Sequence, residues 1–217
     1  HKTNTQLAAR EIRYAYFAKL RSAGLFTNLI TAHHQSDLVE TFFINLNRQA
    51  GINGLKSIPV KRDFIIRPLL AVTGQQVKDY IAEHSIKYRE DASNASYKYA
   101  RNKWRNVLLP SLVEQIPDFE QNAVSSIHKL QQENEVLNWL IEEKTRTLVS
   151  ENENQITIDS EALATYPQGA VFLYRILDKW GFNYTQCEQI LTNGQSTGAL
   201  FYGKTHQLLI DRQSFII

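Results

Sequence analysis

Residues 31–41 limit what this chain can fold into more than any other stretch. An apolar segment over 28–32 predicts a short strand, and helical spacing of apolar residues begins soon after it. In an open α/β sheet, ligands bind at the carboxyl ends of the strands, where a helix N-terminus also attracts phosphate. Two imidazoles and two carboxylates lie at this junction: His33, His34, Asp37 and Glu40. The stretch therefore predicts a ligand site at a strand-to-helix turn.

Two interpretations of the carboxylates are open. Asp37 and Glu40 are three residues apart and share one helix face, which suits a Mg²⁺ ion beside a nucleotide. The same spacing fits a helix cap, with Asp37 as the N-cap and Glu40 at the third helical position. The histidines also fit a structural role at the strand end. A zinc site is a weaker interpretation, because adjacent histidines on a strand point to opposite faces and no cysteine cluster lies nearby.

Strands and helices alternate through the first half of the chain. Apolar spacing predicts helices over 5–22, 37–47 and 73–85, and a buried strand over 64–66. This alternation is typical of a parallel sheet with crossover helices. We therefore predict the α/β class for a first domain that covers residues 1–117 and ends at a proline.

The second half predicts a smaller, mainly helical domain over 118–217. It opens with a long acidic amphipathic helix over 118–149, and three shorter helices follow. Two apolar runs, 199–202 and 207–210, predict a terminal hairpin. The single cysteine, Cys187, lies in a predicted amphipathic helix, and we expect a buried core thiol rather than a nucleophile.

Cysteine content and hydropathy indicate the cellular compartment of the protein. One cysteine in 217 residues cannot form an internal disulfide, which fits a reducing cytoplasm. No run of apolar residues approaches the roughly 18 that a membrane helix needs. We expect a cytoplasmic protein with no membrane partner.

Charge is distributed unevenly along the chain. Residues 1–105 hold 17 Lys and Arg against 8 Asp and Glu, whereas residues 106–217 hold 7 against 14. A positive field attracts polyanions, and neutralised phosphates supply much of the affinity for nucleic acid. We therefore expect RNA contacts from Arg48, Arg101 and Lys103, although an ordinary solvated surface is the plain alternative.

Several short motifs occur in an order that resembles one known family. They lie at residues 8–14, 33–41, 48–55, 65–70, 90–94 and 101–105. The set is similar to that of tRNA(Ile)-lysidine synthetases, which are N-type ATP pyrophosphatases. Their second signature is a His-His-x-x-Asp-x-x-Glu-Thr block, which His33 to Thr41 match. Gln49 stands where that family usually has glycine.

The resemblance implies a parallel-sheet N-type ATP pyrophosphatase domain, of the adenine nucleotide alpha hydrolase type, followed by a helical linker and a first C-terminal domain. The family's first signature is a Ser-Gly-Gly-x-Asp-Ser phosphate loop, and this sequence has no such run. The chain begins at His1 and contains no Met. We therefore expect a domain that is incomplete at its N-terminus, and a segment that is inactive alone.

The resemblance also implies an activity, namely a tRNA-modifying ligase. ATP adenylates the anticodon cytidine of a minor tRNA(Ile) with a CAU anticodon and releases pyrophosphate. Free L-lysine then displaces AMP to form lysidine. ATP and Mg²⁺ are the implied cofactors, and a homodimer is a further expectation.

The family's site residues carry over to matching positions. The expected catalytic residues are Arg13, Asp37, Glu40 and Arg105. Asp37 and Glu40 are also the expected metal ligands. Residues expected to contact ATP or substrate are His33, His34, Arg10 and Arg67.

Two alternative functions are open. One is another N-type ATP pyrophosphatase that acts on tRNA, such as a thiolase, although thiolases use cysteine pairs and this chain has Cys187 alone. The other is a non-catalytic RNA-binding module, which the missing phosphate loop would suit.

Overall fold

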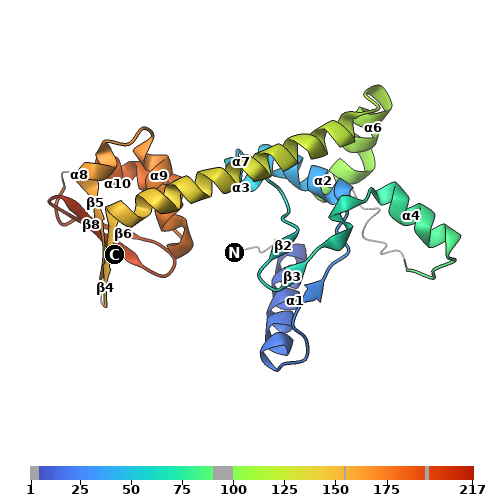
Figure 1. Cartoon of the computed structure of the whole chain (residues 1–217), viewed down its shortest axis with the longest axis horizontal. Helices are drawn as coiled ribbons and strands as arrows, with labels where there is room; N and C mark the ends of the chain where they lie inside the picture. The colour runs from blue at the N-terminus through green and yellow to red at the C-terminus, as the bar shows by residue number, and fades with distance from the viewer. Residues whose placement is uncertain (1–4, 90–99, 154, 194–195) are drawn as a thin grey trace. The chain divides into compact units, whose positions relative to one another are not determined.

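The computed structural model describes residues 5–89, 100–153, 155–193 and 196–217 (Figure 1). The chain divides into two compact units, His1–Asn134 and Glu135–Ile217. This division by contacts falls within a long helix. The domain boundary predicted at Pro117 stays a prediction. None of the helices in the described ranges combines the length and apolar character that crossing a bilayer requires.

The first unit alternates helices with three short strands. Its elements are α1 (Thr5–Ser22), β1 (Leu29–Ile30), α2 (Gln35–Leu46), α3 (Ile52–Leu55), β2 (Lys61–Arg62), β3 (Ile65–Ile66), η1 (Pro68–Ala71), α4 (Gly74–Glu83), α5 (Ala100–Lys103), η3 (Trp104–Leu108), α6 (Leu109–Gln115) and α7 (Phe119–Leu148). The helices predicted over 5–22 and 73–85 are confirmed, and the Thr73 hydroxyl caps α4 by accepting from the Gln76 backbone N–H at 3.1 Å. The motif at 90–94 lies outside the described residues.

A parallel strand pair organises the sheet of this unit. β1 pairs with β3 in the register Leu29 with Ile65 and Ile30 with Ile66. β2 adds an antiparallel strand that the sequence did not predict, because its residues are polar and exposed. The parallel α/β interpretation of this region is confirmed. Because parallel strands end at the same edge, the residues that follow β1 and β3 lie near each other.

Aromatic stacking joins α2 to the segment after α5. The Phe43 ring stacks on the Trp104 ring, with centroids 4.8 Å apart, and on Phe119 at 5.7 Å. These rings pack against a buried core that includes Leu38 and Ile127. Trp104 therefore serves the core rather than offering a free stacking surface for a base. The contact places η3 directly beside α2.

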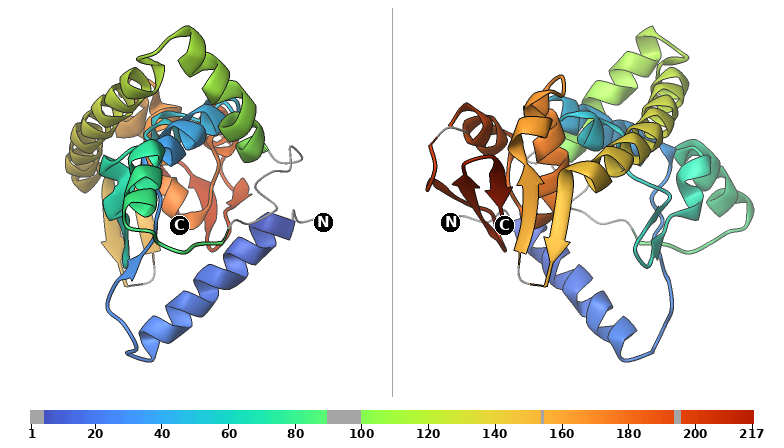
Figure 2. Two further views of the ribbon diagram at one scale, coloured as in Figure 1. Left: turned by 90° about the vertical axis from the view of Figure 1, so that its right-hand side faces the viewer. Right: turned by 60° about the vertical axis from the view of Figure 1, so that its left-hand side comes forward.

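The second unit is a five-stranded antiparallel sheet with helices. Its elements after α7 are β4 (Val149–Asn152), β5 (Gln155–Asp159), α8 (Ser160–Ala164), α9 (Gly169–Leu177), η4 (Asp178–Trp180), α10 (Tyr184–Thr192), β6 (Leu200–Tyr202), β7 (Gln207–Asp211) and β8 (Ser214–Ile216). The strand order is β4-β5-β8-β7-β6, and β4 and β5 lie side by side in Figure 2. Helices still make up most of residues 118–217, with α7 alone spanning Phe119–Leu148, but the sheet is larger than the predicted hairpin. The pairing of β5 with β8 links residues far apart in sequence, which local patterns do not reveal.

Cys187 lies on α10 in the apolar core of this unit and is fully buried. Burial raises the pKa of its thiol to about 12, with a smaller contribution from the charge of Asp178. The predicted core thiol is confirmed. Because the thiolate is the reactive form, a buried and protonated thiol is inert.

We predict that an aromatic disulfide reagent at pH 8 leaves Cys187 unmodified in the folded chain and modifies one thiol after denaturation. Absorbance of the released thiolate measures the reaction. Gln189→Cys is the matched control, because Gln189 is exposed on the same helix. It should add one thiol that reacts in the folded state. Rapid modification of the wild-type chain before unfolding would contradict the prediction.

Candidate functional site

The Asp37 carboxylate caps the N-terminus of α2 by accepting a backbone hydrogen bond. His34 is the N-cap in an extended conformation, and its backbone N–H donates to Asp37 Oδ2 at 3.0 Å. The helix therefore begins at Gln35, and Asp37 occupies the third helical position instead of the N-cap. This corrects the capping arrangement inferred from the sequence. It also removes Glu40 from the cap and places it one turn further along the helix.

Arg105 lies between the two carboxylates. Its Nε donates to Glu40 Oε1 at 2.6 Å, and its Nη2 donates to Glu40 Oε2 at 3.0 Å and to Asp37 Oδ1 at 2.7 Å. Its Nη1 has no hydrogen-bond partner among the residues that the structure describes. A planar guanidinium can bind two carboxylates in this way, whereas a lysine ammonium cannot form the same fork.

A second arginine supports the same carboxylate. Arg101 Nε lies 3.2 Å from Glu40 Oε2, and Arg101 Nη2 donates to the Thr41 hydroxyl at 2.8 Å. The structure thus turns Arg101, an expected RNA contact, toward the site. Sequence reasoning missed the contact from Thr41, although Thr41 ends the motif that contains Glu40.

Burial makes this cluster electrostatically costly. The Glu40 side chain is 1% exposed and the Arg105 side chain 34%. Burial raises the pKa of Glu40, and the hydrogen bond and charge of Arg105 oppose that shift. Burial would lower the pKa of Arg105, but its bonds and charge interactions with Glu40 and Asp37 outweigh it and raise the pKa. Arg105 thus favours the charged form of Glu40, and the two carboxylates favour the charged form of Arg105.

Cations surround His33 beside this cluster. Its Nδ1 lies 2.8 Å from the Thr31 hydroxyl. Burial lowers the pKa of His33, the charge of Asp37 opposes the shift, and three arginines lower the pKa further: Arg67, Arg101 and Arg10. Arg67 is buried, and its Nη1 donates to the Pro59 carbonyl at 2.8 Å. The structure thus brings His33, Arg67, Arg101 and Arg10 close enough to interact.

His34 has a different environment. Its Nε2 lies 3.6 Å from Asp37 Oδ2, and a Cβ added to Gly74 would lie 3.1 Å from its ring. His34 therefore packs between the start of α2 and the start of α4.

The other expected site residues lie on the surface. Arg13, Arg48 and Lys103 are exposed. Among the described residues, no ion pair joins Arg13 to the carboxylates of α2. The structure therefore joins Asp37 and Glu40 to Arg105 and leaves Arg13 outside that set of contacts. His33 interacts with the charge of Asp37.

The carboxylates do not form a magnesium site as they lie. All four of their oxygens accept hydrogen bonds from nitrogen donors, three from Arg105 and one from the His34 backbone. Within the described ranges, no three side chains of His, Cys, Asp or Glu gather as a metal site would require. A cation at Asp37 and Glu40 would have to displace Arg105.

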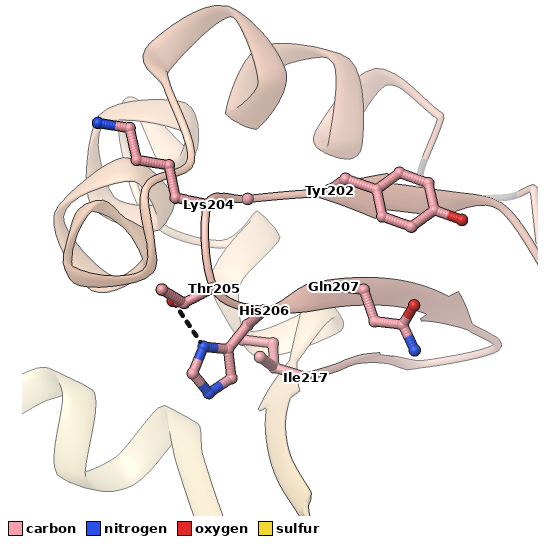
Figure 3. Close-up of a pocket in the computed structure, with 7 residues that line it drawn as sticks. Tyr202, Lys204, Thr205, His206, Gln207 and Ile217 are labelled. Carbon is pink, nitrogen blue, oxygen red and sulfur yellow. Dashed lines mark hydrogen bonds between the residues drawn. The ribbon is translucent and has the colours of Figure 1, made fainter.

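A separate hollow lies on the second unit at the turn between β6 and β7 (Figure 3). It has a volume of about 520 Å³ and is open to solvent. Its lining includes Tyr202, Lys204, His206 and Gln207. In Figure 3 the Lys204 side chain points away from His206, so these two groups do not converge on one ligand.

Comparison with known proteins gives the family. A family model described as a PP-loop domain matches residues 1–112, just over half of the chain. This chain belongs to the PP-loop domain family. A second model, described as a TilS substrate binding domain, matches residues 151–217 of this PP-loop protein.

Several curated relatives of this PP-loop protein carry the name tRNA(Ile)-lysidine synthase. The relative from Parabacteroides distasonis is 33% identical over 208 residues, covering 95% of this chain and 47% of the relative. The relative from Porphyromonas gingivalis is 32% identical over 214 residues, covering 98% and 46%. The relative from Bacteroides thetaiotaomicron is 32% identical over 219 residues, covering 100% and 50%. The chain thus spans about half the length of the curated relatives it matches.

We predict that Arg105→Met lowers the free energy of unfolding of this PP-loop protein by about 3 kcal/mol, because it leaves the buried Glu40 charge without its main partner. Adding Glu40→Gln should restore part of the loss, since no charge then remains to be compensated. Urea denaturation followed by circular dichroism measures both variants.

The matched control for this experiment is Arg62→Met. The Arg62 side chain is 73% exposed and lies 4.0 Å from Asp63. An exposed pair of this kind contributes little, so the control should barely change stability. A double variant that loses as much as the two single variants combined would show that Arg105 and Glu40 do not act as a pair.

Proposed function

We propose that this chain is part of a tRNA(Ile)-lysidine synthetase. In the first step, the C2 oxygen of the anticodon cytidine attacks the α-phosphate of ATP, and pyrophosphate leaves. In the second step, the ε-amine of free L-lysine attacks C2, AMP leaves, and the amine loses a proton. The match to a PP-loop domain and the name of the relatives support this proposal.

The observation that carries the proposal is the position of Arg105. Asp37 and Glu40 hold Nε and Nη2, while Nη1 has no partner among the described residues. The side chain is also one-third exposed. A charged guanidinium fixed on one side and open on the other is suited to bind a phosphate oxygen. We infer that Arg105 neutralises charge on the phosphate as the leaving group departs.

The cations around His33 extend this site. Arg67 follows β3 and His33 follows β1, so the parallel strand pair brings both to one sheet edge. Phosphates bind at this edge in open α/β sheets. We infer that the positive group formed by His33, Arg67, Arg101 and Arg10 receives the phosphates of ATP.

Some parts of the proposal come from the family resemblance alone. They are the CAU anticodon, free L-lysine, Mg²⁺, a homodimer, a cytoplasmic location and a catalytic role for Arg13. Because the carboxylates hold Arg105, we assign no step to Mg²⁺ at Asp37 and Glu40. In this arrangement the two carboxylates position Arg105.

RNA contacts belong to exposed cations of the first unit. Arg101 is directed toward Glu40, whereas Lys103 and Arg48 are exposed and free to meet phosphate. The match of residues 151–217 to a substrate binding domain supports a further tRNA contact in the second unit.

We predict that Asp37→Asn in the complete enzyme lowers tRNA-dependent pyrophosphate release by at least about 100-fold, as loss of an electrostatic group in a site does. Asn keeps an amide oxygen that accepts from the His34 backbone N–H, so the cap and the melting temperature should change little. Its amide cannot supply the charge that holds Arg105.

The control is Asp79→Asn, which makes the same chemical change at an exposed position of α4. Both rate and melting temperature should stay near wild type. If Asp37→Asn keeps its activity, or loses activity and stability in parallel, the carboxylate serves only the helix cap. Failure of the unmodified complete enzyme to release pyrophosphate with tRNA would instead favour a non-catalytic RNA-binding module.

We predict that Lys103→Glu weakens tRNA binding by the complete enzyme and reduces the salt slope of log Kd by about 1. Lys129→Glu makes the same charge change at an exposed position of α7 and should leave the slope unchanged. Filter binding at several salt concentrations measures both. Equal slopes for the two variants would reject the assignment of RNA contact to Lys103.

A further inference from the structure

Thr31 is held in place by the sheet. It follows β1, and its backbone N–H donates to the Ile66 carbonyl at 3.0 Å, which continues the parallel pairing with β3 by one more bond. Its hydroxyl then lies 2.8 Å from His33 Nδ1. The hydroxyl position is thus set by the backbone of the sheet. One nitrogen of the His33 ring is in turn held by that hydroxyl.

The neighbours of His33 decide its charge. Burial together with the charges of Arg67, Arg101 and Arg10 lowers its pKa, and Asp37 opposes them. At neutral pH the ring is therefore uncharged and carries one N–H, on either Nδ1 or Nε2. Which nitrogen carries it determines whether Nε2 donates a hydrogen bond or accepts one.

We propose that Thr31 is a positioning residue that donates its hydroxyl proton to His33 Nδ1 and so holds His33 as the Nε2–H tautomer. His33 then acts as a neutral hydrogen-bond donor to an anionic ligand. Only the nature of that anion, a nucleotide phosphate, rests on the function proposed above.

Two observations support this direction of the hydrogen bond. His33 Nδ1 is the only hydrogen-bond partner of the Thr31 hydroxyl among the described residues. The arginines near His33 carry donors and no acceptors. A ligand that accepts from those arginines presents oxygen lone pairs, which a bare Nε2 lone pair would repel and an Nε2–H would bind.

The second unit contains a matched pair that lacks these features. The Thr205 hydroxyl lies 2.9 Å from His206 Nδ1, as the dashed line in Figure 3 shows. This pair is exposed. The Thr205 hydroxyl also lies 3.5 Å from the Trp180 carbonyl, which gives its proton a second acceptor. The same two residue types are thus paired outside the proposed site.

The test is ¹⁵N NMR of the chain labelled in its histidines, because the shifts of Nδ1 and Nε2 report which nitrogen carries the proton. His33→Gln assigns the His33 signals. We expect the Nε2–H tautomer for His33 in wild type and in Thr31→Ser, which keeps the hydroxyl. We expect a mixture of tautomers in Thr31→Val, which keeps the shape and loses the hydroxyl. Thr205→Val should leave His33 unchanged.

An Nδ1–H tautomer in the wild-type spectrum would overturn the proposal, even if Thr31→Val failed to fold. An unchanged tautomer in a folded Thr31→Val chain would also overturn it. Because this measurement needs no catalysis, its outcome is independent of whether the proposed function holds.

A kinetic measurement in the complete enzyme tests the consequence. Thr31→Val should raise KM for ATP about tenfold with a smaller change in kcat, since a hydrogen bond to a charged ligand is weakened. Thr31→Ser should restore KM. If Thr31 has only a structural role, Thr31→Val should lower the melting temperature without raising KM more than it changes kcat. That result would count against the proposal.

Discussion

One ion cluster constrains how the segments of the first unit are arranged: the guanidinium of Arg105 lies between Asp37 and Glu40. Glu40 is almost completely buried, so its charge is tolerated only because Arg105 and Arg101 lie against it. Arg105 reaches this position because Trp104 stacks on Phe43 and fixes η3 beside α2. η3 is a π-helical turn, in which Leu109 N–H bonds to the Trp104 carbonyl, and such turns are frequent at functional sites. Apolar packing thus positions the charged group.

The parallel pairing of β1 with β3 supplies the other half of the site. Each strand is only two residues long, yet the pair is enough to align Thr31 and His33 with Arg67. The buried Arg67 side chain then bonds to the Pro59 carbonyl, which ties the chain before β2 to the same edge. The ion cluster lies on the helices, whereas the cations around His33 lie at the sheet edge. Asp37 and Arg101 interact with both groups.

Local patterns predicted much of this arrangement. The helices over 5–22 and 73–85 and the buried Cys187 follow from spacing and composition, which depend on near neighbours in sequence. The start of α2 was misplaced, because the cap uses a backbone N–H that no side-chain pattern reports. The five-stranded sheet was missed for a similar reason, since β5 pairs with β8 across more than fifty residues. The partner of Glu40 also comes from a distant segment, and only the folded chain shows that it is Arg105.

Under the proposed function, the ion cluster serves to bind phosphate rather than to stabilise the fold. Taking charges out of water costs free energy, and an apolar group of similar volume is often as stable as a buried ion pair. The fold therefore gains little net stability from Arg105, Asp37 and Glu40, although losing one partner alone would be costly. What the cluster does provide is a guanidinium with its orientation fixed before any ligand binds. Such preorganised charge in a partly dehydrated site is the main means by which enzymes stabilise charge that develops during reaction. Under our proposal the same reasoning extends to His33, because a ring held by the Thr31 hydroxyl is already oriented before an anion binds.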